Sequence, residues 1–423
     1  MMTFRYLILA VAMPVACGLG SPSPAGDDPK PAPKKTDAGR VVLTERAAAQ
    51  IRKLMADSTE FKYLRVRVAD GEQFKLDLES QTDPKADLRG ESRGVTVVVD
   101  RKSAAVLPAG IVLDYLDEGG TRGFKFSSPG SDRPPDTSVS LADARRGFKT
   151  TLRPQPPNAA RAGVPVPPAD VFRVVRYDAA PGKLAAYLSP DPKDGKKHPA
   201  IVWITGGDCN SIDEGCWRDA GGLGDQSASA YRKAGLVMMF PALRGGNDNP
   251  GAKEGFLGEV DDVLAAAAFL RKQPYVDPDR VYLGGHSTGG TLALLTAECS
   301  DTFRAVFSFG PIDDVLGYGL GGNPFVLTDP KELRLRSPTQ WLHSIRSPVF
   351  VFEGSSGGNA GALRSMAGKT KNPKVKFFVV EGANHFNVLG PTNRLIVEKV
   401  LKDTGPACNL AFTAEEVNKP FAK

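Results

Sequence analysis

The stretch Arg280-Val-Tyr-Leu-Gly-Gly-His-Ser-Thr-Gly-Gly-Thr-Leu-Ala-Leu-Leu-Thr-Ala297 decides the fold. It reads as an apolar strand, then a serine between two glycines, then an apolar helix. This order is typical of a nucleophile elbow, in which the serine sits on a sharp strand-to-helix turn. Glycines are needed beside the serine because the turn is strained and the neighbouring backbones pack closely. A coincidental turn is the alternative, but the flanking strand and helix favour Ser287 as a nucleophile.

Apolar strands and helices alternate on both sides of this motif. We expect a hairpin over 171–188 and then strands at 200–205, 236–240, 280–284, 305–309, 348–352 and 375–380. Near-continuous apolar strands separated by helices are typical of a mostly parallel sheet with helices on both faces. We therefore predict an α/β domain over residues 171–423.

A serine nucleophile needs a base, and the chain has four histidines. His198 and His343 each precede a strand, and His286 lies inside the elbow. Only His385 follows the last strand, at the carboxyl end where ligands bind in open α/β sheets. We predict His385 as the base, against the alternative of an ordinary histidine in a surface loop.

An oxyanion hole needs two backbone amides that point at the developing negative charge. The amide of Thr288, directly after the nucleophile, is the first candidate. The second is Gly207, in the Gly206-Gly207-Asp208 loop that follows the strand at 200–205. The alternative is that these glycines only form a turn.

Further motifs support a family resemblance: Phe240-Pro-Ala-Leu-Arg244-Gly245, Glu259-Val-Asp-Asp-Val-Leu-Ala265, Tyr275-Val-Asp-Pro-Asp-Arg-Val281 and Leu335-Arg-Ser-Pro338. With the elbow, they resemble the prolyl oligopeptidase and dienelactone hydrolase branches of the α/β-hydrolases. The resemblance covers about residues 170–402. It implies a serine hydrolase that cleaves an ester or peptide bond of a small-molecule or peptide substrate through an acyl-enzyme, with no cofactor.

The chain departs from this family at the catalytic acid. The family has a pattern like His-Gly-x-x-Asp just past the seventh strand, but here Gly357 occupies the Asp position. Chain order requires an acid between the serine and the histidine. The carboxylates that satisfy this order are Glu298, Asp301, Asp313, Asp314, Asp329, Glu332, Glu353 and Glu381.

Three solutions for the acid remain open. Asp313 and Asp314 directly follow the sixth strand, and we name Asp314 as the expected acid. Glu353, at the end of the seventh strand, is the next candidate. A Ser–His dyad without an acid is the third solution, and it would leave His385 less well oriented. We therefore expect an active serine hydrolase. The alternative is a catalytically impaired pseudo-hydrolase that acts as a binding protein.

Residues 41–132 predict a separate small α+β, mostly β domain. The motifs Val42-Leu-Thr-Glu-Arg-Ala-Ala48, Val97-Val-Val-Asp100, Leu113-Asp-Tyr115 and Gly123-Phe-Lys-Phe-Ser-Ser-Pro129 resemble the HesB/IscA-like fold of A-type iron–sulfur carriers. That family supplies cysteines near 70–72 and after the final proline, whereas this chain has no cysteine between Cys17 and Cys209. Because thiolates hold such clusters, the domain is expected to be a scaffold without cluster ligands.

The N-terminus predicts export. Arg5 precedes an apolar run over 6–13 that is too short to span a bilayer but fits a signal peptide at 1–20. The alternative is a buried N-terminal strand. Proline-rich linkers are expected at 21–40 and 133–170. We therefore expect a secreted or cell-envelope (periplasmic) protein, tethered to the membrane through Cys17 only if that residue is lipidated, although Pro14 is unusual for a lipoprotein signal.

Charge and cysteine content exclude other classes. The net charge of +6 comes from 54 basic and 48 acidic residues without a basic stripe, so nucleic acid is not an expected partner. The chain has no CxxC motif and no Cys/His cluster, so a metal site is not expected. In an oxidising compartment Cys209 and Cys216 could close a small disulfide loop, although the four cysteines after residue 17 allow three pairings.

Overall fold

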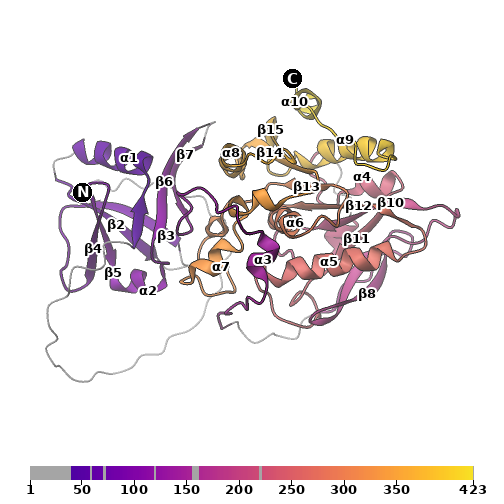
Figure 1. The fold of residues 1–423 in the computed structure, drawn as a ribbon, viewed down its shortest axis with the longest axis horizontal. Helices are drawn as coiled ribbons and strands as arrows, with labels where there is room; N and C mark the ends of the chain where they lie inside the picture. Colours follow the sequence, from indigo (N-terminus) through magenta and orange to yellow (C-terminus); the bar gives the residue numbers. More distant parts are fainter. Residues whose placement is uncertain are drawn as a thin grey trace.

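The computed structural model describes residues 40–57, 60–69, 73–118, 121–154, 162–218 and 222–422. The predicted signal peptide, Cys17 and residues 21–39 of the first linker lie outside these ranges. Figure 1 shows a small β-rich domain beside a larger α/β domain. Among the described helices, none is both long and apolar enough to cross a membrane.

The described part of the N-terminal domain contains two small sheets and two helices. Its strands are β1 (Val41–Leu43), β2 (Tyr63–Ala69), β3 (Gln73–Glu79), β4 (Asp87–Ser92), β5 (Val95–Asp100), β6 (Ile111–Glu118) and β7 (Thr121–Ser127). The sheet orders are β3-β2-β5-β4 and β1-β6-β7. Helix α1 (Glu45–Ala56) begins where the Thr44 hydroxyl accepts a hydrogen bond from the Ala47 amide, and α2 (Arg101–Val106) is capped in the same way by Asp100. The sequence Asp-Leu-Arg-Gly-Glu-Ser of β4 has one apolar residue, so its pairing with β5, rather than a hydrophobic pattern, defines it.

The second domain is built on one eight-stranded sheet, as the sequence predicts. Its strands are β8 (Arg173–Ala179), β9 (Gly182–Leu188), β10 (His198–Ile204), β11 (Val237–Pro241), β12 (Val276–His286), β13 (Val306–Phe309), β14 (Val349–Ser356) and β15 (Val375–Asn384). The order is β15-β14-β13-β12-β10-β11-β9-β8. Strands β10 to β15 are parallel to one another, β9 pairs antiparallel with β11, and β8 and β9 form the antiparallel hairpin.

Helices cover both faces of this sheet. They are α4 (Ser229–Lys233), α5 (Gly258–Arg271), α6 (Thr288–Cys299), α7 (Pro330–Arg334), α8 (Ala360–Lys369), α9 (Leu389–Lys402) and α10 (Ala414–Asn418). Alternate residues of β10 enter two different cores. Val202 packs in the core that includes α5, α6 and α8, whereas Trp203 packs in the core that includes α4, α9 and α10. This two-sided burial explains why the strands are apolar at nearly every position.

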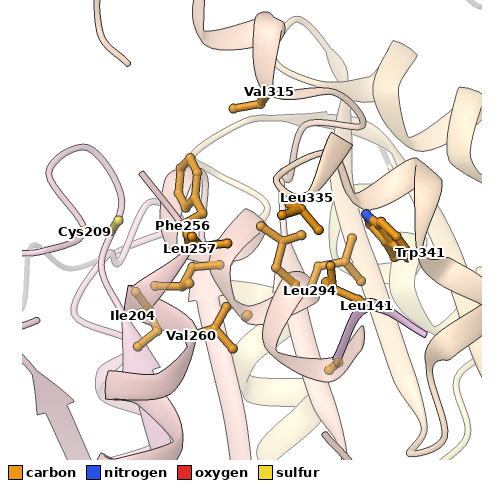
Figure 2. Packing of buried hydrophobic residues seen from close by; sticks show 14 of the residues in the cluster. Leu141, Ile204, Cys209, Phe256, Leu257, Val260, Leu294, Val315, Leu335 and Trp341 are labelled. Atoms are coloured by element: carbon orange, nitrogen blue, oxygen red, sulfur yellow. The ribbon is translucent and has the colours of Figure 1, made fainter. Parts of the chain in front are cut away.

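The segment after the small domain packs on the sheet instead of acting as a free linker over its described part. Helix α3 (Leu141–Arg145) places the fully buried Leu141 in the same core as Leu294 and Trp341 (Figure 2). Further along, the amide of Thr151 donates to Glu332 at 2.6 Å. Part of the proline-rich stretch 133–170 is therefore anchored to the large domain, through Leu141 and Thr151.

The two domains also contact each other directly. The Lys125 ammonium on β7 lies 2.6 Å from a carboxylate oxygen of Asp313. The amide and hydroxyl of Ser128 donate to the two carboxylate oxygens of Asp314 at 2.9 and 2.8 Å. Both aspartates lie in the loop after β13, at the carboxyl edge of the large sheet, so the small domain rests beside that edge.

Candidate active site

Ser287 occupies the turn between β12 and α6. The strand ends at His286 and the helix begins at Thr288, which leaves the serine at φ +56° and ψ −117°. A non-glycine residue in this region is strained, and such strain is concentrated at functional sites. The Ser287 amide donates to the carbonyl of Phe309 at 2.8 Å, which ties the turn to the adjacent strand. The predicted strand–turn–helix context of the nucleophile is therefore present.

The glycines around the serine are explained by close backbone contacts. A Cβ atom at Gly285 would collide with the backbone of Gly289, and a Cβ at Gly289 would collide with the carbonyl of Ile204. A Cβ at Gly290 would meet the carbonyl of Phe309. Helix α6 can therefore approach the sheet, and present Ser287 at its edge, only because these positions lack side chains.

His385 and Glu353 form a buried pair at the same edge. His385 directly follows β15, and its Nδ1 lies 2.7 Å from Oε2 of Glu353, near the end of the neighbouring strand β14. The Glu353 side chain is fully buried, whereas 16% of the His385 side chain is exposed. The amides of Gly354 and Asn359 donate to the two Glu353 oxygens at 2.7 and 3.2 Å. These hydrogen bonds fix the carboxylate in place.

This pairing sets the tautomer of the base. An ionised carboxylate only accepts hydrogen bonds, so Nδ1 of His385 carries the proton and donates it to Glu353. Nε2 is then the basic nitrogen and can accept the proton of Ser287. A carboxylate in this position can also stabilise an imidazolium. Glu353 thus has the position and contacts of the acid that the sequence left open.

The expectation that Asp314 supplies the acid is corrected by these contacts. Both oxygens of Asp314 accept hydrogen bonds from Ser128, and Asp313 pairs with Lys125. Burial raises the pKa of Asp314. The two aspartates follow β13 as predicted, but they serve the contact between the domains.

Ser287 and the His385–Glu353 pair meet around Gly310. The carbonyl of Phe309 accepts the Ser287 amide, and a Cβ on the next residue, Gly310, would lie 2.6 Å from both His385 Cε1 and Glu353 Oε2. Within residues 222–422, which are described without a gap, the Ser287 hydroxyl and the His385 ring form no hydrogen bond. Catalytic hydrogen bonds are often long without substrate and shorten in the reacting complex.

The predicted oxyanion loop lies against the elbow. A Cβ on Gly206 would be 3.3 Å from Ser287 Cβ, and the Thr288 hydroxyl donates to the Gly207 carbonyl at 2.9 Å. Thr288 is the first residue of α6, so its amide has no partner within the helix. The loop that carries Gly207 and the start of α6 are thus adjacent, which is the arrangement that the two predicted amides require.

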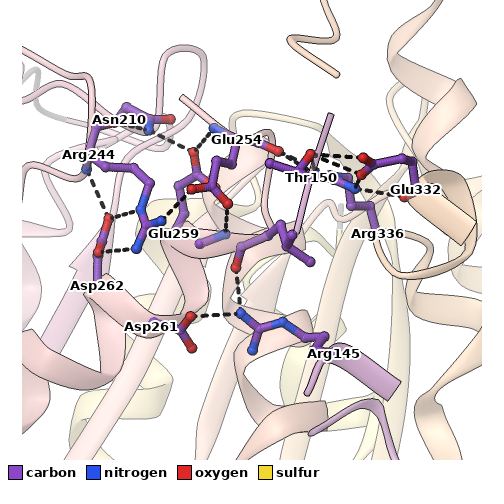
Figure 3. A network of polar contacts seen from close by, with 12 residues as sticks. Arg145, Thr150, Asn210, Arg244, Glu254, Glu259, Asp261, Asp262, Glu332 and Arg336 are labelled. Atoms are coloured by element: carbon purple, nitrogen blue, oxygen red, sulfur yellow. Dashed lines mark hydrogen bonds and ion pairs between the residues drawn. The ribbon is translucent and has the colours of Figure 1, made fainter. Parts of the chain in front are cut away.

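A buried polar network holds the predicted oxyanion loop in place (Figure 3). Asn210 donates to the carbonyl of Arg244 at 2.7 Å and to Glu259 at 3.1 Å. The Arg244 guanidinium pairs with Asp262 at 2.8 Å and with Glu254 at 2.6 Å. The family-like motifs around Arg244 and Glu259 are therefore structural supports of the site.

His286, the residue before the nucleophile, packs behind the base. Its Nε2 lies 2.9 Å from the backbone carbonyl of His385, and the two imidazole centroids are 4.6 Å apart. Burial, reinforced by the neighbouring His385, lowers the pKa of His286 to about 3. The ring is therefore neutral and donates from Nε2 to the carbonyl. The sequence pattern placed His286 in the elbow but could not show this contact.

The cysteine arrangement differs from the predicted small disulfide loop. Cys209, Cys216, Cys299 and Cys408 are all free thiols. Cys209 and Cys216 lie in different hydrophobic cores, which separates their side chains.

The described residues contain no cluster of three or more His, Cys, Asp or Glu side chains with the placement of a metal site. The small domain holds no cysteine in residues 41–132, so its donor set does not fit an iron–sulfur cluster.

Two family profiles match the chain. The profile "Iron-sulphur cluster biosynthesis" matches residues 40–133, and the profile "Prolyl oligopeptidase family" matches residues 225–355. Protein HesB of Leptolyngbya boryana is 34% identical over 96 residues, which cover 21% of this chain and 78% of HesB. The small domain therefore belongs to the HesB family, and residues 225–355 are similar to the prolyl oligopeptidase family.

Known proteins similar to this chain also include peptidases. The uncharacterized peptidase YtmA of Bacillus subtilis is 29% identical over 150 residues, covering 32% of this chain and 57% of YtmA. The dual function macrocyclase-peptidase POPB of Galerina marginata is 28% identical over 131 residues, covering 27% of this chain and 18% of POPB. The chain thus spans less than two thirds of either relative.

Solved structures similar to part of this chain include a puromycin hydrolase and an esterase of Pyrococcus furiosus. The hydrolase has a TM-score of 0.45 and 16% identity, and the match covers 55% of this chain and 39% of that chain. The esterase has a TM-score of 0.43 and 16% identity, and the match covers 60% of this chain and 98% of that chain.

Proposed function

We propose that the protein is a serine hydrolase that cleaves an ester or peptide bond through an acyl-enzyme. Ser287 is the nucleophile, His385 the base, Glu353 the acid, and the amides of Thr288 and Gly207 form the oxyanion hole. The observation that carries the proposal is the 2.7 Å contact between His385 Nδ1 and the buried carboxylate of Glu353.

The proposed reaction follows from these positions. The Ser287 oxygen bonds to the substrate carbonyl carbon while its proton moves to His385 Nε2, and the carbonyl oxygen becomes an oxyanion stabilised by the two amides. The tetrahedral intermediate then collapses. The carbon–leaving-group bond breaks, and His385 gives its proton to the departing alcohol or amine. Water repeats the sequence with His385 as base, which releases the acid product and regenerates Ser287.

The alternative function is that of a pseudo-hydrolase that binds a ligand without cleaving it. Gly357 at the family's acid position is the feature that favours this alternative. A carboxylate from four positions earlier in the chain now lies against the base, and the nucleophile keeps its strained turn. These observations favour the enzyme.

A fluorophosphonate reagent tests the proposal, because it phosphonylates only an activated serine. We expect stoichiometric labelling of the wild-type chain and none of the Ser287→Ala variant. The variant His385→Ala should be labelled far more slowly. An unlabelled wild-type chain that is folded by circular dichroism would overturn the proposal.

We also propose that the protein is exported. The N-terminal sequence supports a secreted or cell-envelope protein, with Cys17 as a tether only if it carries lipid. Fractionation of expressing cells, together with N-terminal sequencing of the mature chain, would test both points. Recovery of the full-length chain from the cytosol alone would contradict them.

A further inference from the structure

Phe386, the residue directly after the catalytic base, is unusually exposed. The residue is 52% exposed. Among the large hydrophobic residues that are exposed in the described part of the chain, it is the one aromatic. Isolated exposed apolar residues are normal on protein surfaces. The position of this one is not ordinary, because its ring centroid lies 5.1 Å from that of His385 in an edge-on arrangement.

The buried side of Phe386 is fixed by the site itself. Its ring lies 5.5 Å from that of His286, also edge-on, so the two histidines support it. The other side is available to solvent. The ring therefore forms an apolar surface next to the base.

A second apolar residue lies in the neighbouring segment. Leu223 is 47% exposed, and its carbonyl accepts a hydrogen bond from the Gly390 amide at 2.8 Å, which fixes the segment against the start of α9. A Cβ on the next residue, Gly224, would lie 4.0 Å from the Phe386 Cβ. The backbone next to Leu223 thus runs beside Phe386, so the two exposed apolar residues lie on neighbouring segments.

The chemistry of the reaction decides which part of a substrate meets this surface. His385 must deliver its proton to the leaving group, so the leaving atom has to come within about 3 Å of the imidazole. A side group two to four bonds beyond that atom can reach a ring whose centroid is 5.1 Å from the imidazole. The acyl part of the substrate is held instead at Ser287 and the oxyanion amides.

We propose that Phe386 and Leu223 form a leaving-group subsite that selects an apolar, preferably aromatic, alcohol or amine. For a peptide, this group is the side chain of the residue after the scissile bond. The inference rests on the proposed serine hydrolase activity and adds a substrate class to it. Because hydrophobic pockets discriminate by about 10- to 200-fold per group, a half-exposed wall should contribute near the lower limit.

Two esters that share one acyl group test the subsite. Ethyl and 2-phenylethyl esters release alcohols of similar acidity, and kcat/KM reports only the steps up to alcohol release. We expect the wild type to favour the 2-phenylethyl ester by about 10-fold. Phe386→Ser should reduce this ratio to near one, and Phe386→Leu should keep part of it. If Phe386→Ser is inactive, the ratio is measured with Phe386→Leu and Leu223→Ser.

Controls separate this inference from the activity itself. Val174 on β8 is 39% exposed and lies far along the sheet order from β15, so Val174→Ser should leave the ratio unchanged. A second pair of ethyl esters with different acyl groups should give the same ratio in wild type and Phe386→Ser. Equal leaving-group ratios in wild type and both subsite variants would overturn the subsite alone. A wild-type chain that cleaves no ester and no matched peptide would instead overturn the proposed function.

Discussion

Glu353 and His385 meet at 2.7 Å across two adjacent parallel strands, although 32 positions separate them in the chain. Strand β14 presents Glu353 near its carboxyl end, and β15 presents His385 just past its own. The usual family solution places an aspartate on the loop after β14. Here the longer glutamate side chain begins four residues earlier, on the strand, and spans the remaining distance to the imidazole. The loop position that it replaces is Gly357.

Replacement of the acid should abolish most activity. In Glu353→Gln, the amide can donate to Nδ1 and favour the tautomer in which Nε2 carries the proton, so the base cannot accept from Ser287. We expect kcat to fall by about 1,000- to 10,000-fold. The matched control is Asp314→Asn, which should keep kcat within a few-fold because Asp314 bonds to Ser128. The reverse pattern of losses would reinstate Asp314 as the acid.

The nucleophile and base should behave as one unit. Ser287→Ala and His385→Ala should each remove nearly all hydrolysis, and the double variant should be no slower than either single variant. Steady-state kinetics on one activated ester would measure all three. Losses that multiply in the double variant would show that the two side chains act independently.

Gly310 offers a test of the geometry of the pair. It has φ +57°, and a Cβ there would lie 2.6 Å from both Glu353 and His385, so Gly310→Ala should separate the acid from the base. We expect kcat to fall at least about 100-fold. Gly357 also has positive φ, at +77°, but a Cβ there meets nothing within 4 Å. Gly357→Ala should therefore cost about 1 kcal/mol of stability with little change in kcat. Similar kcat losses in both variants would indicate backbone strain as the cause.

The lowered pKa of His286 predicts a specific pH dependence of stability. The folded ring has a pKa of about 3, whereas an unfolded histidine titrates near about 6.5. As pH falls below that value, the unfolded chain binds the proton first, so folding stability decreases. At about pH 5 the loss is about 2 kcal/mol. The wild type should lose that much more than His286→Phe when urea unfolding is compared at about pH 7.5 and 5. Equal losses would mean that the ring is not held neutral.

The HesB-family domain should bind no iron–sulfur cluster. It has no thiolate to offer, because no cysteine lies between Cys17 and Cys209. Anaerobic reconstitution of the full chain with iron and sulfide, followed by desalting, should leave the protein colourless. A stable brown protein with stoichiometric iron and sulfide would contradict the expectation and would require ligands other than cysteine.

The sequence by itself determined the architecture of the large domain and two of its three proposed catalytic side chains. The strands and the helix after the elbow follow from local apolar runs, which the two-sided burial of a parallel sheet imposes at nearly every strand position. Ser287 could be predicted because its glycines are required by contacts within a short segment. His385 could be predicted because the chain has few histidines and only this one follows a strand at the correct edge.

Only the tertiary structure singled out Glu353 as the proposed acid. Eight carboxylates satisfied the chain order, and the local sequence around Asp314 favoured it as well as any. The assignment of the acid depends on which carboxylate oxygen reaches His385 across the strand ends. Asp314 instead accepts a hydrogen bond from Ser128 of the small domain. The tertiary structure also explains why Cys209 and Cys216 are free thiols, because it places them in different cores. Contacts between distant segments depend on packing, and no local pattern records them.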